Sequence, residues 1–494
     1  MNWKEKARGL TWNIQPFIGG RYRPSRSTQT FETVNPATER VICRVPVGDS
    51  DDIDEAVRVA RERYDDGSWS ELPPRRRAEI LCKLAELMVQ HKAEIALLDS
   101  LEMGKPIQAA LWDAEQYAPM LLRSWASFAD KLVGESSPIA RGPMILNTYE
   151  PRGVVGAITP WNFPSVNAVG KFGPALAAGN TVVLKPSELT PSSALRLAEL
   201  ALQAGLPDGV LNVVPGLGAT VGAALASHFG VDMLSFTGST VTGRRIMELS
   251  GRSNGKPLLL ECGGKSPQVV FDDISDLDAV ADAVVQNVLR NQGQVCSAHT
   301  RLLVHEGIKQ ALLDKVVSRA RQYVPGDPLD ESTTFGPLAS SGQRDRVRTY
   351  VEAGLRAGAS AVLKGAIQES EGCYVSPTIF DRVESSMSIV QEEIFGPVLC
   401  VQGFTTEEEA IALANGTQYG LVATIWTRDI GRGRRLAHAI KAGSVSIRSS
   451  GQQGSDSGCF LSHEPQKSSG FGSELGVGGL RSYSTLKLMS FGGA

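Results

Sequence analysis

The chain contains five short apolar runs in close succession: VVGAIT (154–159), TVVLKP (181–186), LNVVPG (211–216), MLSFTG (233–238) and PLLLEC (257–262). Stretches with helical spacing at 192–204, 219–229 and 241–250 separate the last four of these runs. Short strands that alternate with longer helices are typical of βα units, whose strands form a parallel sheet. The sequence therefore predicts an α/β fold built on a parallel sheet.

Polar residues or glycines follow each run, at the point where the predicted strand ends. In open parallel sheets, ligands bind beyond the carboxyl ends of the strands. The candidate binding residues are therefore those that stand just after the runs: Asn162, Lys185, Gly216, Gly238 and Glu261.

A second α/β series follows, with a domain boundary expected near the glycines of CGGKS (262–266). Strands are predicted at 267–271, 301–304, 393–401 and 423–427, and helices at 277–290 and 308–323. One continuous helix is predicted over 73–104, and the basic run 75–77 at its start is interpreted as a solvated face. The Gly- and Ser-rich tail 449–479 is interpreted as a loop that crosses a surface or a subunit contact.

Composition limits the function classes. The 494 residues correspond to two to four domains, and the formal charge of -3 gives no electrostatic footprint for nucleic acid. No apolar stretch has the length of a membrane span or of a signal-peptide core. Seven cysteines without a CxxC pair form neither a disulfide framework nor a zinc ribbon. We expect a cytoplasmic enzyme without a metal.

Cys296 is the first candidate catalytic residue. It lies in NQGQVCSAHT, where glycine and polar neighbours predict a tight exposed turn after a helix. A thiol in such a turn is a better nucleophile than one among apolar residues, although a structural cysteine is the alternative. His299 completes a Cys-x-x-His pattern, but no second pair exists to form a zinc site.

Glu261 and Asn162 are the next candidates. Glu261 ends the run LLLE, and partial desolvation there would raise its pKa and suit it to general-base chemistry. Alternatively, the amides of Gly263 and Gly264 cap it. Asn162 in TPWNFP could donate a hydrogen bond to an oxyanion.

Three further motifs have alternative interpretations. The glycine-rich stretches 216–222 and 238–243 could place backbone amides against a phosphate, or they are ordinary turns before helices. Lys185 and Glu188 could hold two hydroxyls of one ribose, or they form an exposed pair. GRSNG (251–255) matches a serine-hydrolase pattern, but a helix enters it and a strand leaves it, so Ser253 is predicted to lie in a turn.

The combination of motifs resembles the NAD(P)-dependent aldehyde dehydrogenase superfamily from about residue 17 to 427, with a weaker similarity at 467–476. Within the superfamily it is most similar to bacterial γ-glutamyl-aminobutyraldehyde or broad-range aldehyde dehydrogenases. Six motifs occur in the expected order: TPWNFP (159–164), KFGPALAAGNTVVLKPSE (171–188), FTGSTVTG (236–243), LECGGKSP (260–267), GQVCSA (293–298) and EEIFGPV (392–398).

The resemblance implies a Rossmann-like cofactor domain (1–129 and 149–262), a second α/β catalytic domain (263–448) and a small β oligomerisation segment (130–148 and 449–494). It also implies that Cys296 attacks an aldehyde, that Asn162 and the Cys296 amide hold the oxyanion, and that Glu261 activates the water that hydrolyses a thioester. The product is the carboxylate. A homodimer or homotetramer is expected.

The cofactor implied is NAD rather than NADP, because the Glu188 carboxylate would repel a 2′-phosphate. The resemblance assigns the following residues to cofactor binding: Thr159, Pro160, Trp161, Lys185, Ser187, Glu188, Gly218, Phe236, Thr237, Gly238, Ser239, Thr242, Cys262, Glu393 and Phe395. It assigns these to the substrate: Phe163, Asn167, Gly170, Val295, Ser297 and His463.

The chain departs from the family pattern near the substrate. Cys262 replaces the usual Leu after the base, and we interpret it as a small apolar residue. Gly170 and Asn167 predict a wider, more polar funnel. Arg448 and His463 stand where Asn and Phe are usual, which hints at an anionic or polar substrate.

Two other functions remain open from the sequence. In a CoA-acylating enzyme the thioester would pass to CoA, but a hydrolytic base such as Glu261 would waste it. A non-catalytic protein that keeps the fold for binding or structure would have no chemical need for Cys296, Asn162 and Glu261 together.

Overall fold

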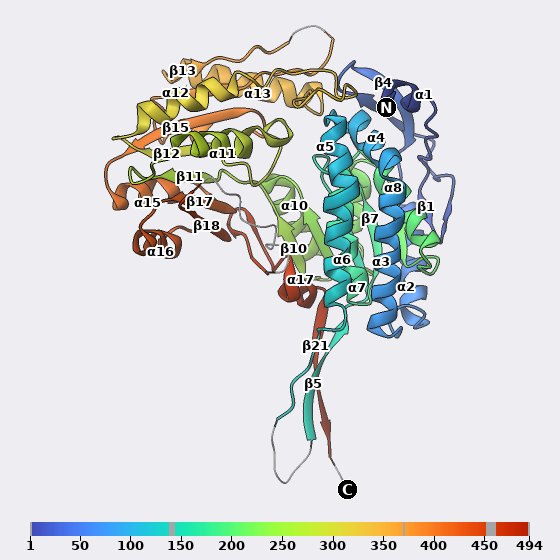
Figure 1. The fold of residues 1–494 in the computed structure, drawn as a ribbon. Helices are drawn as coiled ribbons and strands as arrows, with labels where there is room; N and C mark the ends of the chain where they lie inside the picture. The colour runs from blue at the N-terminus through green and yellow to red at the C-terminus, as the bar shows by residue number, and fades with distance from the viewer. Residues whose placement is uncertain (1, 138–143, 369–370, 451–460, 493–494) are drawn as a thin grey trace.

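The protein consists of two α/β bodies that lie side by side and a two-stranded arm that projects from them (Figure 1). The structure, a computed structural model, describes residues 2–137, 144–368, 371–450 and 461–492. No helix within these ranges is long and apolar enough to span a membrane.

The first body is built on an eight-stranded sheet of order β2-β1-β8-β7-β6-β9-β10-β20, with β1 (Phe17–Ile18) and β2 (Arg21–Tyr22) at one edge. The five apolar runs form its parallel centre, as predicted, and the strand order reverses between β6 and β9. In such sheets the reversal marks the place where ligands bind. The central strands are β6 (Val154–Ile158), β7 (Thr181–Lys185), β8 (Leu211–Val213), β9 (Met233–Thr237) and β10 (Leu258–Glu261).

Both faces of this sheet are covered, which is why its strands are apolar without interruption. On β6, Val155 and Ala157 pack into one cluster with the helices of one face, whereas Val154 and Ile158 pack into the cluster on the other. The first face is covered by α3 (Pro74–Gln90), α6 (Ala118–Phe128), α7 (Pro164–Ala177) and α8 (Ser192–Gln203), and the second by α2 (Ser50–Asp65), α9 (Ala223–Ser227) and α10 (Thr240–Arg252).

Two local predictions in this body were wrong, and a third is correct only in part. The single helix expected over 73–104 is α3 followed by α4 (Lys92–Met103), because the backbone leaves helical geometry at His91 (φ -97°, ψ 14°). The helix expected at 219–229 is a π-helix over Gly218–Gly222 followed by the short α9. In the basic run, Arg75 and Arg76 are exposed as predicted, but Arg77 is buried and donates to the carbonyls of Leu72 and Ala177.

The second body has a seven-stranded sheet of order β13-β14-β15-β12-β11-β17-β18. The strand predicted at 393–401 begins only at Val398, because Phe395 has φ 62° and turns the chain. The strands are β11 (Pro267–Val270), β12 (Arg301–His305), β13 (Ser360–Leu363), β14 (Thr378–Asp381), β15 (Val398–Phe404), β17 (Val422–Trp426) and β18 (Ser444–Arg448), with helices α11 (Leu277–Leu289) and α12 (Lys309–Ala320) packed on them.

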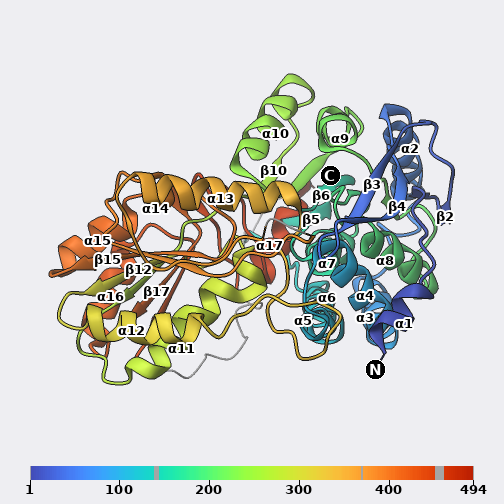
Figure 2. The same ribbon diagram turned by 90° about the horizontal axis from the view of Figure 1, so that it is seen from above.

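The C-terminal segment runs between the two bodies. β19 (Gln466–Lys467) pairs with β16 (Tyr419–Gly420), and β20 (Gly470–Phe471) then pairs with β10 at the edge of the first sheet. α17 (Gly476–Ser482) follows. Seen from above, α10 and β10 lie on the side of the first body that faces the second (Figure 2).

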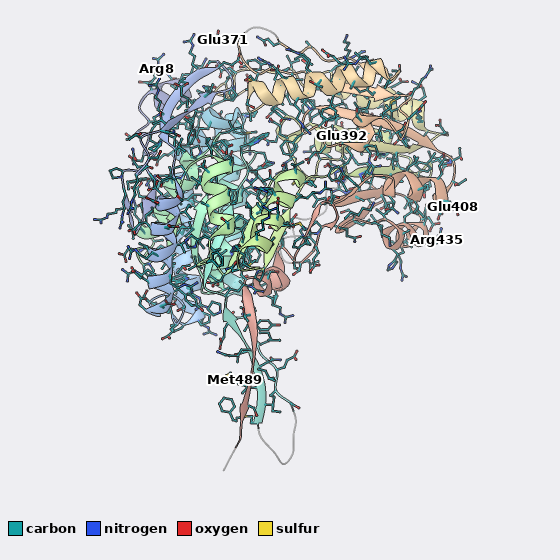
Figure 3. All side chains as sticks on the ribbon, turned by 180° about the vertical axis from the view of Figure 1, so that it is seen from behind. Arg8, Glu371, Glu392, Glu408, Arg435 and Met489 are labelled. Atoms are coloured by element: carbon teal, nitrogen blue, oxygen red, sulfur yellow. The ribbon has the colours of Figure 1, made fainter. Side chains whose placement is uncertain are left out.

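The arm pairs β5 (Met144–Pro151) with β21 (Ser484–Phe491) in one antiparallel register. Met489 of β21 lies on this arm, away from the two α/β bodies (Figure 3). Leu486, Leu488 and Phe491 are exposed on it. Parts of the expected oligomerisation segment, 138–143 and 451–460, lie outside the described residues.

Candidate active site

Cys296 lies where two cavities meet. Cavity A has a volume of about 510 Å³ and is lined by α10 and the loops around Asn162 and Phe395. Cavity B, of about 310 Å³, is lined by α7, β10 and the C-terminal segment. Cys296 belongs to the walls of both, so a molecule in either cavity has access to its sulfur. Cys296 lies in a turn after a helical segment, as predicted, but the residue is half-buried rather than exposed.

The loop that presents Cys296 depends on glycine and on left-handed backbone. Asn291 and Gln292 have φ 52° and 59°, and Gly293 has φ 75°. A Cβ on Gly293 would lie 2.3 Å from the Gly396 carbonyl, and one on Gly264 would lie 2.3 Å from the Cys296 carbonyl. The glycines of the two motifs are thus required for the close approach of these loops to one another.

Asn162 is fixed against the cysteine loop. Its buried side chain donates from Nδ2 to the Gln294 carbonyl at 2.9 Å and accepts from Asn167 Nδ2 at 3.2 Å. Asn291 Nδ2 donates to the Asn162 carbonyl at 2.9 Å. Since an amide nitrogen has two hydrogens, the second remains available to an acceptor near Cys296.

Glu261 ends β10 as a buried carboxylate in the wall of cavity B. Burial raises its pKa well above the ordinary value, the Glu474 carboxylate raises it further, and the Lys171 ammonium opposes the rise. Among the described residues, its Oε1 has no hydrogen-bond partner. The alternative of capping by glycine amides is wrong, because the Gly264 N–H donates to Glu393.

Burial raises the pKa of the Cys296 thiol to about 12, and the carboxylates of Glu261 and Glu393 contribute to the rise. The sulfur is therefore protonated near neutral pH. Any attack by Cys296 requires a base to take its proton, and Glu261 lines the same cavity.

The walls of cavity A contain the N-terminus of α10. Ser239 caps this helix, with Oγ accepting from the Thr242 N–H at 3.1 Å. Gly238 packs against the Phe236 ring, which a Cβ would approach to 2.5 Å. Cys262 also lines this cavity, and its sulfur lies under Gly243 of α10.

Glu393 and Phe395 close the opposite side of cavity A. Glu393 accepts from the Gly264 N–H at 3.0 Å, and burial raises its pKa to about 7. The Phe395 ring stands edge-on to Trp161 at 5.3 Å between centroids. The left-handed backbone of Phe395 directs this loop toward the cavity.

The structure brings most of the predicted site residues together. Cavity A is lined by Pro160, Trp161, Asn162, Phe163, Asn167, Thr237, Gly238, Ser239, Cys262, Cys296, Glu393 and Phe395. Cavity B is lined by all six residues assigned to the substrate: Phe163, Asn167, Gly170, Val295, Ser297 and His463.

A second group of predicted cofactor residues lies outside these walls. Lys185 is buried at the end of β7, and its Nζ donates to Glu188 at 3.2 Å and to the Pro186 carbonyl at 2.8 Å. The Thr159 N–H donates to the Lys185 carbonyl. Among the predicted cofactor residues, these are absent from the wall of cavity A: Thr159, Lys185, Ser187, Glu188, Gly218, Phe236 and Thr242.

Sequence reasoning missed several residues of the site. The most important are Lys171 and Glu474, which form an ion pair beside Glu261 across some 300 positions of the chain. Both lie within quoted motifs, but no spacing rule joins them. Gln343 and Arg346 donate to the carbonyls of Phe395 and Glu393 and hold that loop.

Three other residues singled out in the sequence lie outside cavities A and B. Arg448 stacks over Trp426, with its guanidinium 5.6 Å from the ring centre. His299 contacts Thr424 at 3.0 Å. Ser253 ends α10 in a turn, as predicted, and bonds to the Leu249 carbonyl. No cluster of metal-ligating side chains occurs in the described ranges.

Comparisons with known proteins agree with this geometry. The model of the aldehyde dehydrogenase family matches residues 22–489. NADP/NAD-dependent aldehyde dehydrogenase PuuC of Escherichia coli is 42% identical over 485 residues, which cover 98% of this chain and 97% of that protein.

Two solved structures superimpose over nearly the whole chain. One is a cysteine-to-alanine mutant of the P. syringae indole-3-acetaldehyde dehydrogenase AldA in complex with NAD+ and IAA, with TM-score 0.96, 42% identity and 99% coverage of each chain. The other is γ-glutamyl-γ-aminobutyraldehyde dehydrogenase from Burkholderia cenocepacia, with TM-score 0.95, 41% identity and coverage of 99% of this chain and 98% of that one. This chain belongs to the aldehyde dehydrogenase family, and it is an NAD-dependent oxidoreductase that acts on an aldehyde.

Proposed function

We propose that the protein oxidises an aldehyde to its carboxylate with Cys296 as nucleophile, Asn162 as oxyanion donor and Glu261 as general base. The position of Cys296 in the common wall of cavities A and B supports this assignment most strongly. It allows the aldehyde in cavity B and the cofactor in cavity A to reach one sulfur.

In the first step, Glu261 takes the proton of the Cys296 thiol, and the sulfur bonds to the aldehyde carbon. The raised pKa of Glu261 makes it a competent acceptor for a thiol proton. The aldehyde oxygen becomes an oxyanion, which accepts from the free hydrogen of Asn162 Nδ2 and from the Cys296 N–H. The hydrogen bonds of Asn162 to Gln294 and Asn167 hold this donor in place before the reaction.

The nicotinamide of NAD, when bound in cavity A, supplies a hydride acceptor. Loss of the hydride from the carbon leaves a thioester on Cys296. Before hydrolysis, Glu261 releases the thiol proton to solvent and is a carboxylate again. It then removes a proton from water as the water oxygen adds to the thioester carbon, and the C–S bond breaks. The departing thiolate takes this proton back from Glu261, which restores the thiol, and the product acid ionises to the carboxylate.

The residues of cavity A fit a dinucleotide. The N-terminus of α10 lies in the cavity wall at Ser239–Val241, where its amides can bind a diphosphate, with the Thr242 N–H holding the Ser239 side chain. The half-buried Glu393 carboxylate can accept from ribose hydroxyls, and Phe395 can contact the nicotinamide ring. Lys185, Ser187, Glu188 and Gly218 would hold the adenosine side, beyond the cavity wall. Cys262 lines the wall, whereas Thr159 and Phe236 lie outside it.

Replacement of Glu188 by Gln is expected to increase the use of NADP relative to NAD. The Glu188 side chain is 41% exposed, so its repulsion of a 2′-phosphate is partly screened. We expect the ratio of kcat/KM for NADP to that for NAD to rise about tenfold. Steady-state rates with both cofactors measure this, and an unchanged ratio would remove Glu188 from cofactor selection.

Replacement of Asn162 by Ala is expected to lower kcat about 100- to 1000-fold, the usual cost of one oxyanion donor. NAD affinity, measured by titration of the purified variant, should change little. A decrease of less than threefold would show that Asn162 only supports the cysteine loop through Gln294.

We also place the protein in the cytoplasm as a homodimer or homotetramer. The exposed apolar residues of the arm favour contact with a second copy, because such side chains are rarely left in water on a monomer. Sedimentation of the chain with and without residues 484–494 measures this contribution.

A further inference from the structure

A third cavity adjoins cavity B. Cavity C has a volume of about 500 Å³ and lies between Pro106–Asp113, the end of α11 and the end of β18. Phe163 and Arg290 belong to the walls of both B and C. A molecule long enough to pass these two side chains would extend from Cys296 into cavity C.

The residues with a formal charge at neutral pH that line cavity C, among those described, are Lys105, Arg290, Arg448 and Asp113. Lys105 and Asp113 form a buried ion pair, which removes one charge of each sign. Within the described chain, neither Arg290 nor Arg448 has an ion pair with a carboxylate. Cavity C therefore has an excess of two positive charges.

Both arginines are held by aromatic rings rather than by acids. The guanidinium of Arg290 lies 5.5 Å from the centre of the Phe163 ring, and that of Arg448 lies 5.6 Å from the centre of Trp426. The Nζ of Lys105 also lies close to the Phe163 ring, 3.8 Å from its centre. Stacking orients a guanidinium but leaves its N–H donors available to an anion.

The deep end of cavity B has the opposite charge. Glu261 and Glu474 both line it, and Lys171, which bonds to Glu474, is the counter-charge that acts on Glu261. An anionic group would be repelled there and attracted to Arg290 and Arg448. The charge distribution therefore favours one orientation, with the uncharged reacting end inside and an anionic end outside.

We propose that the substrate is an elongated aldehyde with an anionic group at its far end, which cavity C binds through Arg290 and Arg448. The inference deepens the proposed function and rests on it. The aldehyde carbon lies against Cys296, the chain passes Phe163, and the anionic oxygens accept from the two guanidinium groups. A carboxylate and a phosphate both satisfy this chemistry.

The test compares ω-carboxy aldehydes with their methyl esters over a series of chain lengths, with ω-phospho aldehydes as a third arm. In the wild-type enzyme, kcat/KM for the acid should exceed that for the ester about 10- to 100-fold at one preferred length, as expected for charge-assisted hydrogen bonds. The third arm shows which anion is preferred.

The variants Arg290→Met, Arg448→Met and the double variant should each reduce the acid-to-ester ratio, and the double variant should bring it near one. Arg434→Met, an exposed arginine of α16 (Ile430–Ala439) that lines none of these cavities, is the matched control and should keep the wild-type ratio. Raising the ionic strength should lower the ratio in the wild type.

An acid-to-ester ratio of kcat/KM near one in the wild type at every chain length would overturn the inference. A ratio that the double variant does not change would also overturn it. In both cases, oxidation of the esters would leave the proposed function intact. If no aldehyde is oxidised, the proposed function fails. Calorimetric binding of the ω-carboxylic acids and their monoesters to the wild-type and double-variant proteins then decides the inference separately: selective binding of the acid, lost in the double variant, supports it, and equal binding overturns it.

Discussion

Cys296→Ala is expected to abolish aldehyde oxidation while the protein still binds NAD. Removal of an enzymatic nucleophile costs a factor of roughly 10⁴ or more, because no other group can form the covalent intermediate. The alanine side chain is smaller and apolar, so the half-buried site at the meeting of cavities A and B should tolerate it. NADH formation at 340 nm measures the loss, and quenching of tryptophan fluorescence measures NAD binding.

Cys82→Ala is the matched control for this variant. Cys82 is also half-buried, but it lies on α3 and contributes to neither cavity. This variant should retain wild-type turnover. Oxidation by Cys296→Ala within tenfold of the wild-type rate would refute the assignment of the nucleophile, whatever the state of the other cysteines.

The variant Glu261→Gln is expected to slow release of the product more than formation of the acyl-enzyme. A general base typically contributes 10²- to 10⁴-fold, and the amide cannot accept the proton of the attacking water. Formation of the acyl-enzyme should slow less, because solvent bases remove a proton from a thiol more readily than from water. Hydrolysis then limits the rate, so one equivalent of NADH should form before a slower turnover. Mass spectrometry of the acid-quenched enzyme should detect the thioester on Cys296.

The pH dependence gives a second result for the same residue. The pKa of Glu261 is raised by burial and by Glu474, and only the deprotonated carboxylate acts as a base. The hydrolysis rate of the wild type should therefore increase with pH as this group loses its proton, and Glu261→Gln should lose that increase. The raised pKa also predicts that Glu474→Gln moves the increase to lower pH, because one neighbouring negative charge is removed.

Two outcomes would contradict this role. An unchanged steady-state rate with no trapped acyl-enzyme in Glu261→Gln would show that another group activates water. Acceleration of the wild-type enzyme by CoA, with an acyl-CoA as product, would instead favour thioester transfer over hydrolysis.

The parallel sheet of the first body could be predicted because each strand is buried on both faces, which leaves a continuous apolar run in the sequence. Glu261 and Asn162 could be found for the same reason, since both follow such runs. Helix 73–104 could not be predicted correctly, because its break at His91 has no Pro or Gly to mark it.

The surroundings of Glu261 were beyond sequence reasoning. Lys171 and Glu474 are paired only after the C-terminal segment has joined the first sheet. The raised pKa of the Cys296 thiol could not be predicted either. Its polar neighbours in the sequence suggested an exposed thiol, but tertiary packing half-buries it near the carboxylates of Glu261 and Glu393, which raises the pKa. The spacing of apolar residues indicates which face of one helix or strand is buried. The charges around Glu261 and the partial burial of Cys296 instead depend on elements that are far apart in the chain.

The pairing of β20 with β10 has a consequence for the order in which the enzyme becomes competent during its synthesis. Cys296, Glu261 and Asn162 have all left the ribosome long before Glu474 and the strand that covers β10. A nascent chain that ends near residue 448 therefore has its reactive groups but not the neighbouring charge that tunes the base. In such a chain β10 lacks its β20 neighbour and Lys171 lacks its carboxylate partner, so the surroundings of Glu261 are complete only after the last segment has been added.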